Sequence, residues 1–221
     1  MIRRIATILL LLFLCASQAL AADIAAITGK IQKKYSSLTT LTADFTQTLV
    51  NAASKETSTR AGRIFFAQPA LIRWETDTPE KELLVVGKDA AWNAFPEEKN
   101  VYRHPVEDVL GSKTMLRFLS GKGNLSEDFR LEEEQGAPVG QIKLKLVPRQ
   151  ADASLVLAHV WVDDQTWLLG RISIEDFYGN INDVTLSNVK INGSIPKDLF
   201  QYTPPKDYTV FDNLGQSQDA R

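Results

Sequence analysis

Two histidines, His104 and His159, are the side chains of this 221-residue sequence best suited to acid–base or metal chemistry. His104 precedes a proline at the end of an expected strand, and His159 lies within a segment of alternating apolar and polar residues. The sequence contains neither an H-E-x-x-H zinc motif nor a G-x-S-x-G turn that would present a nucleophilic serine. It therefore gives little support for a metal site or a histidine-based catalytic triad.

Two other short motifs resemble chemical sites but have simpler interpretations. The residues Gly111-Ser112-Lys113-Thr114 lack the order of a phosphate-binding loop, so we interpret them as a turn that breaks a helix. The acidic run Glu132-Glu133-Glu134 is typical of a solvated loop. No carboxylate pair stands out for glycoside hydrolysis, so a secreted hydrolase with an acidic site stays only as an alternative. We expect a protein that is not an enzyme and that holds no cofactor or metal.

The large apolar side chains carry more information than the polar ones. Residues two positions apart share one face of a strand in three segments: Ile64 and Phe66, Ile72 and Trp74, and Leu84 and Val86. Trp92 adds a wide aromatic surface. Such a set either fills a core, which the pattern alone favours, or lines a dry hollow that can bind an acyl chain. The argument for the hollow is that a curled sheet has a concave face which a few short helices do not fill.

Composition and charge define the class of protein. With 44% hydrophobic and 24% charged residues, the chain has the proportions of an ordinary globular protein. Its length suits one domain. The formal net charge of −2 provides no basic field that would attract nucleic acid. We expect a monomer without a nucleic-acid partner.

Residues 1–21 have the parts of a cleaved export signal. Two arginines precede an uncharged apolar run over residues 5–16, and Ala19-Leu20-Ala21 has the small-x-small pattern that signal peptidase recognises. The run is shorter than the roughly 20 residues that span a bilayer, which disfavours the alternative of an uncleaved membrane anchor. Cys15, the one cysteine, lies inside the run, so disulfides and thiolate sites are excluded after cleavage. We therefore expect an exported, soluble domain over residues 22–221.

Hydrophobic periodicity changes from helical to strand-like at the start of this domain. Asp23 is a suitable N-cap, and apolar residues follow it at spacings of three and four: Ile24, Ile27, Ile31, Tyr35 and Leu38. This spacing predicts an amphipathic helix. From residue 41 to 49 the period is two, which predicts a half-buried strand with Phe45 and Gln47 on one face.

Most of the remaining chain consists of short segments with strand periodicity and turn residues between them. The expected strands lie near 60–67, 70–76, 82–87, 90–95, 99–103, 128–133, 141–147, 154–163, 167–176 and 181–191. Only residues 105–121 return to a helical period, which predicts two short helices broken at Gly111. About ten or eleven short strands at hairpin spacing predict one antiparallel sheet, and twisted sheets of this size curl or close.

Several short motifs occur in order along the chain. They include Phe45-Thr46-Gln47, Gly62-Arg63-Ile64, Arg73-Trp74-Glu75, Leu84-Val85-Val86-Gly87, the turn Asp176-Phe177-Tyr178-Gly179-Asn180, and Phe200-Gln201-Tyr202-Thr203-Pro204-Pro205. Each motif is weakly specific, but the ordered set resembles the periplasmic outer-membrane lipoprotein carrier family, LolA. The resemblance implies a mainly β fold with a few helices: an incomplete antiparallel β-barrel with a helical lid over a hydrophobic cavity.

The resemblance also implies a function and partners. A carrier of this family shelters the acyl chains of lipoproteins or lipids in its cavity and binds no ATP or metal itself. It receives its cargo from an inner-membrane lipoprotein-releasing ABC transporter, crosses the periplasm and delivers the cargo to an outer-membrane receptor lipoprotein. A paralogue that binds another lipid, or that senses lipid for envelope regulation, is the alternative within this class.

Candidate site residues follow from the resemblance and the apolar pattern together. The cavity is expected to include Ile72, Trp74 and Leu84, which match family positions, with Phe45, Ile64, Phe66, Val86 and Trp92. The lid is expected to include Met115, Leu116 and Phe118, which match the lid helix, with Ile27, Ile31 and Leu119. Gln68 stands where family members often have an arginine that ties the lid down, so it is the candidate latch, without charge assistance. Lys206-Asp207-Tyr208 replaces a glycine and an acidic turn, which is a second departure from the family.

Overall fold

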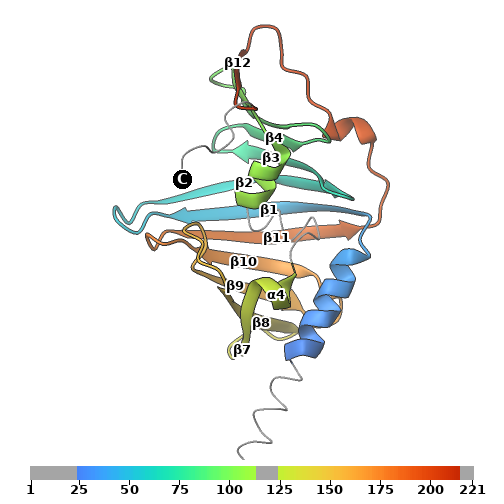
Figure 1. The fold of residues 1–221 in the computed structure, drawn as a ribbon, viewed down its shortest axis with the longest axis vertical. Coiled ribbons are helices and arrows are strands. Elements are labelled where there is room, and N and C mark those ends of the chain that lie inside the picture. The colour runs from blue at the N-terminus through green and yellow to red at the C-terminus, as the bar shows by residue number, and fades with distance from the viewer. Residues whose placement is uncertain (1–23, 113–123, 215–221) are drawn as a thin grey trace, which may run out of the picture.

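The computed structural model describes residues 24–112 and 124–214 (Figure 1). These residues form one 12-stranded sheet in the order β12-β6-β5-β4-β3-β2-β1-β11-β10-β9-β8-β7. The strands are β1 (Thr40–Val50), β2 (Thr57–Ala67), β3 (Leu71–Thr78), β4 (Glu82–Val86), β5 (Ala91–Phe95), β6 (Asn100–His104), β7 (Phe129–Glu134), β8 (Gln141–Pro148), β9 (Leu157–Asp163), β10 (Leu169–Glu175), β11 (Ile181–Ile191) and β12 (Thr209–Asp212). The helical elements are an N-terminal helix over residues 24–36, α2 (Val106–Ser112), α4 (Leu125–Asp128) and the 3-10 helix η1 (Lys197–Phe200).

The sheet consists of two runs of hairpins joined at its centre. Neighbouring strands from β1 to β6 and from β7 to β11 are antiparallel, and the two runs meet where β1 pairs with β11. β12 and β7 are the two edges and do not meet, so the sheet stays open (Figure 1). The predicted mainly β, incomplete antiparallel barrel is confirmed, with one strand more than expected.

The additional strand is β12, which pairs in parallel with β6. All four of its residues are exposed, so its sequence has no hydrophobic alternation that could reveal a strand. The ring of Phe211 stacks on Tyr102 of β6 with centroids 4.8 Å apart. β12 is therefore a strand because it pairs with β6, and the periodicity of its own sequence does not predict it.

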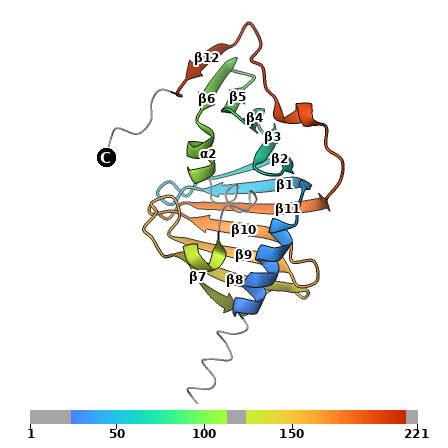
Figure 2. The same ribbon diagram turned by 45° about the vertical axis from the view of Figure 1, so that its right-hand side comes forward.

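The N-terminal helix packs on the inner face of the sheet. Figures 1 and 2 show it crossing β8 to β10, with α4 beside it and α2 over the other half. Ile31 and Tyr35 are 1% and 2% exposed. The Tyr35 hydroxyl oxygen accepts a 2.9 Å hydrogen bond from the backbone N–H of Leu169 in β10. The predicted amphipathic helix is confirmed over residues 24–36, while its expected N-cap, Asp23, lies outside the described residues.

The expected helix pair over residues 105–121 is described only in part. α2 buries Val109 and Leu110 and includes Gly111 and Ser112, while residues 113–121 lie outside the described residues, so the break between two helices stays a prediction. A single glycine costs a helix about 1 kcal/mol, which the burial of two large aliphatic side chains offsets. Among the described residues, no helix is both long and apolar enough to cross a membrane.

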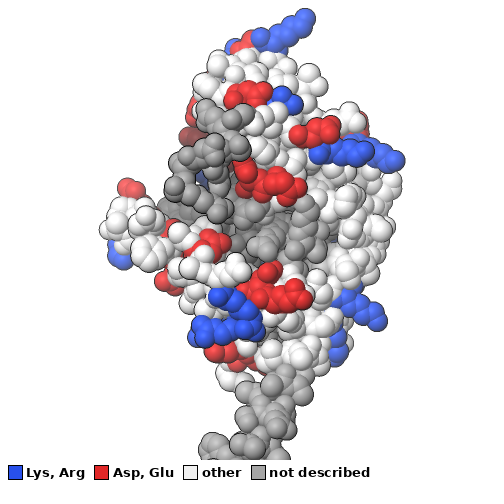
Figure 3. Space-filling model, viewed as in Figure 1, with Lys and Arg blue, Asp and Glu red and all other residues white. Residues whose placement is uncertain are grey.

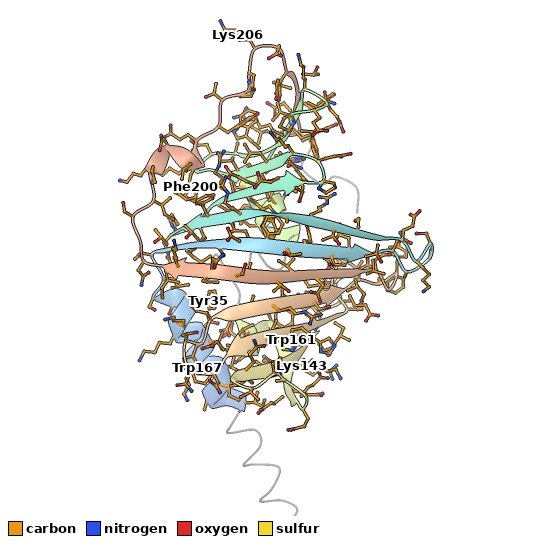
Figure 4. All side chains as sticks on the ribbon, turned by 180° about the vertical axis from the view of Figure 1, so that it is seen from behind. Tyr35, Lys143, Trp161, Trp167, Phe200 and Lys206 are labelled. Carbon is orange, nitrogen blue, oxygen red and sulfur yellow. The ribbon has the colours of Figure 1, made fainter. Side chains whose placement is uncertain are left out.

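The chain after β11 covers the outer face of the β3–β6 half. Figure 4 shows this segment from behind, with Phe200 at the end of η1. Phe200 is 5% exposed, and Val85 and Val101, whose side chains point to the outer face, are fully buried. Arg73 of β3 donates a 3.2 Å hydrogen bond to the carbonyl oxygen of Leu199. The C-terminal segment therefore covers part of the outer face of this half of the sheet.

Candidate binding cavities

Two adjoining cavities lie on the inner face of the sheet. The first, named the central cavity, has a volume of about 560 Å³ and is lined by residues of β1 to β4, β10 and β11. The second, named the β7–β10 cavity, has a volume of about 880 Å³ and lies between β7 to β10, α4 and Ile31 of the N-terminal helix. Ile172 of β10 lines both cavities, so the two adjoin at this residue.

The central cavity combines apolar and hydrogen-bonding side chains. Its apolar lining includes Leu49, Trp74, Leu84, Ile172, Ile174, Ile181 and Val184. The ring of Trp74 packs against Phe45 with centroids 4.6 Å apart. Polar strand residues also line the cavity: Gln47, Arg60, Thr76, Glu82 and Asn182. The cavity can therefore hold an amphiphilic ligand.

The β7–β10 cavity has an apolar floor. Every strand residue in its lining is apolar: Phe129, Leu131, Leu144, Leu146, Pro148, Ala158, Val160, Val162, Leu169 and Ile172. Its polar lining residues lie on α4 and in the β8–β9 loop, among them Glu127, Arg149 and Asp152. A floor of this kind suits hydrocarbon chains, and the polar groups lie at its rim.

Two loops meet at the rim of the central cavity, the β1–β2 loop and the β10–β11 turn. Asn180 accepts a 3.0 Å hydrogen bond from the backbone N–H of Ala52 and donates a 2.8 Å bond to Asp176. The hydrogen bond from the Asn180 side chain is the main cause that holds the pKa of Asp176 below its ordinary value. The turn presents Phe177 and Tyr178 to solvent, at 71% and 77% exposure. Asn180 thus ties the two loops together at the rim.

The expected cavity residues divide into two groups. Trp74 and Leu84 line the central cavity, and the expected lid residue Ile31 lines the β7–β10 cavity. Five others share the inner face but are at most 2% exposed in the packed core: Phe45, Ile64, Phe66, Ile72 and Val86. Ile27 packs against the same core. The filled core and the hollow, which were alternatives in the sequence, are both present side by side.

Trp92 does not share the inner face. In the β4–β5 pairing it lies opposite Val85, whereas Leu84 lies opposite Asn93, so Trp92 and Leu84 point to opposite sides. The ring of Tyr202 lies 5.9 Å from the ring of Trp92, measured between centroids. The guanidinium of Arg103 lies over the Trp92 ring, 5.2 Å from its centroid. The expectation that Trp92 lines the cavity is wrong, because the C-terminal segment gives the outer face an aromatic partner that periodicity could not foresee.

The expected latch and lid helix are only partly described. Gln68 is exposed in the turn between β2 and β3, and its backbone N–H donates a 2.9 Å hydrogen bond to the carbonyl oxygen of Thr39. The lid residues Met115, Leu116, Phe118 and Leu119 lie outside the described residues. The roles of Gln68 and of this segment therefore stay predictions.

The two histidines lie outside both cavities. His104 stacks on Tyr102 with ring centroids 6.4 Å apart, and His159 Nδ1 is 3.0 Å from a carboxylate oxygen of Glu134 on the outer face. Glu134, expected in a solvated loop, ends β7 and pairs with Lys143, whose hydrogen bond is the main cause of the lowered pKa of this carboxyl. Within the described ranges no three His, Cys, Asp or Glu residues gather to hold a metal.

Charge is distributed unevenly over the face that bears the helices. Figure 3 shows acidic side chains near the middle of this face and basic ones mostly towards its margins. A polyanion would meet repulsion at its centre. The charge distribution therefore disfavours a polyanion, and the apolar linings of the two cavities favour a largely apolar ligand.

Comparison with known proteins assigns the fold to a family. The family described as outer membrane lipoprotein carrier protein LolA matches residues 36–203, a span that holds β1 to β11 and η1. The chain belongs to the LolA family. An outer-membrane lipoprotein carrier protein from Legionella pneumophila (strain Lens) is 30% identical over 181 residues, which cover 81% of this chain and 87% of the relative. A protein of the same name from Nitrosomonas europaea is 27% identical over 173 residues, which cover 77% of this chain and 82% of the relative.

Solved structures show the same fold at lower identity. An uncharacterized conserved protein from Thermus thermophilus has a TM-score of 0.56 at 18% identity and covers 86% of this chain and 99% of its own. The lipoprotein LppX from Mycobacterium tuberculosis has a TM-score of 0.51 at 15% identity. The match covers 79% of this chain and 99% of LppX. The fold is therefore shared by proteins with very different sequences.

Proposed function

We propose that the protein is a non-enzymatic periplasmic carrier that shelters the acyl chains of lipoproteins and ferries them from the inner to the outer membrane. The observation that supports this most is the pair of adjoining cavities on the inner face, one of which has an entirely apolar strand floor. The names of the LolA relatives point to the same cargo.

The physical case for a carrier follows from the cost of exposing lipid to water. Each buried CH₂ recovers about 0.8 kcal/mol, so an acylated protein does not leave a membrane unaided on a useful timescale. A carrier has to offset most of that cost and still release its cargo to the next acceptor. A cavity between an open sheet and helices, such as the β7–β10 cavity, meets both needs, because helices can separate from a sheet without breaking its strand pairing.

The finer parts of the pathway belong to the same proposal. The signal over residues 1–21 directs export and is removed. An inner-membrane lipoprotein-releasing ABC transporter loads the carrier, and an outer-membrane receptor lipoprotein unloads it. The lid covers the inner face, with Ile27 and Ile31 on the N-terminal helix and the remaining lid residues over 115–119, and Gln68 latches it.

The test is native mass spectrometry of the protein purified from periplasm without detergent. The wild-type protein is expected to carry a lipid or an acylated peptide that organic extraction releases. Trp74→Glu and Leu84→Glu place a charge in the central cavity and should abolish this added mass. Thr46→Glu introduces the same charge at an exposed, outward-facing position of β1 and should leave the cargo in place.

One further measurement and one further variant serve as controls. Circular dichroism melting shows whether each variant is folded. Trp74→Ala, which adds no charge, gives a milder test of the same cavity. A clean apo mass for the wild-type protein, with no uptake of lipid added in vitro, would contradict the carrier proposal. Cargo retained by both folded charge variants would show that the central cavity does not hold it.

A further inference from the structure

Five polar side chains interrupt the inner face of the sheet at one end of the central cavity. Gln47, Arg60, Thr76, Glu82 and Asn182 come from five different strands and all line this cavity. Strand residues that face an acyl-binding hollow are expected to be apolar, as they are throughout the lining of the β7–β10 cavity. Places where a sequence breaks its own pattern are often functional sites.

Strand register brings these side chains together. Gln47 pairs with Arg60 across β1–β2, and Thr76 pairs with Glu82 across β3–β4. The Gln47 side-chain N–H donates a 2.9 Å hydrogen bond to Asn182 Oδ1, and Arg60 Nη1 lies 2.8 Å from Glu82 Oε2. The result is a polar cluster on neighbouring strands, with the apolar side chains of Trp74 and Leu84 next to it.

The stability of the fold does not explain this polar cluster. The Arg60 and Glu82 side chains are 40% and 21% exposed, and an ion pair with this access to water contributes little to folding. Thr76 is only 5% exposed, so its hydroxyl is held in a poorly solvated place. An apolar residue in place of Thr76 would extend the core at lower cost, because no hydroxyl would then have to be buried.

The bonds within the cluster leave atoms for a ligand. The bond between the two amides uses Nε2 of Gln47 and Oδ1 of Asn182, which leaves Oε1 as an acceptor and Nδ2 as a donor. A guanidinium carries five N–H donors, and the contact of Arg60 with Glu82 uses one of its nitrogens. A neutral group with carbonyl oxygens and an N–H fits this set.

We propose that the central cavity binds the hydrogen-bonding head of the acylated cargo, that is the amide and ester groups of an acylated cysteine. The acyl chains extend past Ile172 into the β7–β10 cavity, and the polypeptide leaves at the rim formed by the β1–β2 loop and the β10–β11 turn. This inference rests on the proposed carrier function and adds to it an orientation of the cargo and a site that reads its head group.

The first experiment maps this orientation by photo-crosslinking. A synthetic triacylated cysteinyl lipopeptide is prepared in two forms, with a diazirine either in the residue after the cysteine or at the end of an acyl chain. The peptide diazirine is expected to label residues 51–56 and 176–180, and the acyl diazirine is expected to label β7 to β10. The reverse labelling pattern would overturn the inference.

The second experiment separates head-group binding from binding of hydrocarbon. The double variant Gln47→Leu, Asn182→Leu removes the amides, and the control Thr46→Leu, Thr185→Leu changes an outward-facing pair across the same two strands. Two lost neutral hydrogen bonds predict about a tenfold weaker affinity for the lipopeptide. The affinity for diphenylhexatriene, a hydrocarbon probe without a polar head, should not fall.

The outcomes distinguish this inference from the proposed function. If the wild-type protein binds both probes and the amide variant still binds the lipopeptide as tightly, the head-group site is wrong and the carrier proposal stands. An equal loss of affinity for both probes in the amide variant would also overturn the head-group site, because the substitutions would then have disturbed the whole cavity. If the wild-type protein binds neither probe, the carrier proposal itself fails, and this inference with it.

Discussion

Gly62 lies where the backbone of the next strand occupies the space of a side chain. A Cβ added there would lie 1.8 Å from the carbonyl oxygen of Glu75 and 3.0 Å from the ring of Phe45. The register of β2 against β3 shifts between Ala61 and Gly62. Since a backbone carbonyl cannot swing aside as the end of a side chain can, any side chain at this position forces two strands apart next to Trp74.

Gly62→Ala should therefore lower the free energy of unfolding by about 1–3 kcal/mol, the usual cost of overpacking. Urea unfolding followed by tryptophan fluorescence measures the change. Gly29→Ala is the matched control, because a Cβ at that helical position meets nothing within 4 Å, and alanine favours a helix over glycine by about 0.5–1 kcal/mol. An unchanged midpoint for Gly62→Ala would show that the strands adjust more freely than the structure indicates.

Single residues also show where sequence reasoning succeeds. Trp74 and Trp92 are both aromatic, both lie on strands and were both expected at the cavity, yet only Trp74 faces inward. Size and hydrophobicity predict burial well, but the side on which a residue is buried depends on what covers each face. The C-terminal segment that covers Trp92 becomes visible only in three dimensions.

At the scale of elements, the N-terminal helix is joined to the sheet by the Tyr35 hydroxyl, which accepts a hydrogen bond from the N–H of Leu169. Burial is the main cause that raises the pKa of Tyr35 well above its ordinary value. The folded protein therefore keeps this hydroxyl protonated at a pH where the unfolded chain, with a tyrosine pKa of about 10, has lost the proton. The stabilisation is complete below pH 10 and is lost progressively as the pH rises towards the folded pKa.

This linkage predicts a pH-dependent difference between the wild-type protein and Tyr35→Phe. At pH 8 the variant should be less stable by about 1–3 kcal/mol, because the N–H of Leu169 loses its acceptor. Above pH 10 the difference should shrink by up to about 1.4 kcal/mol per pH unit. Urea midpoints at pH 8 and pH 11 measure it, with Tyr208→Phe as the control for a less buried tyrosine. A difference that stays constant with pH would contradict the assignment.

Elements with a strong local period were predictable, and the others were not. Period two over 41–49 and the spacing of three and four after residue 23 gave β1 and the N-terminal helix almost to their ends, because both bury one continuous face. β12 has no such face, and it is a strand because it pairs with β6. α2 contains a glycine, and the burial of Val109 and Leu110 stabilises it as a helix. The polar cluster of the central cavity could not be predicted from the sequence either. The one indication of it was Gln47, a polar residue on the inward face of the predicted strand.

At the scale of the whole molecule, an open sheet has edges that must not pair with other chains. The β7 edge carries a row of charged residues, Arg130, Glu132, Glu133 and Glu134, with the first three exposed. Charges on an edge strand oppose pairing with a second copy. This edge supports the expectation that the protein is a monomer.

Replacing Glu132 and Glu133 with valine should therefore produce self-association at high protein concentration. Sedimentation velocity as a function of concentration measures it. The control is the double change Glu97→Val, Glu98→Val, which alters the charge equally in the exposed turn between β5 and β6. A β7 variant that stays monomeric, or a control that associates as strongly, would show that edge pairing is not what these charges prevent.

The pairing of β1 with β11 also determines when the protein can fold. Thr39 bonds to Asn192 from 153 residues away, and the β1–β11 ladder begins beside that contact. Contacts so distant in sequence close late and slow the folding of β proteins to milliseconds or seconds. The hairpins from β2 to β6 can form early, but the two halves of the sheet join only when residue 191 is available to pair with β1. In the export that we propose, the chain therefore stays incompletely folded, without its central cavity, until nearly all of it has crossed the membrane.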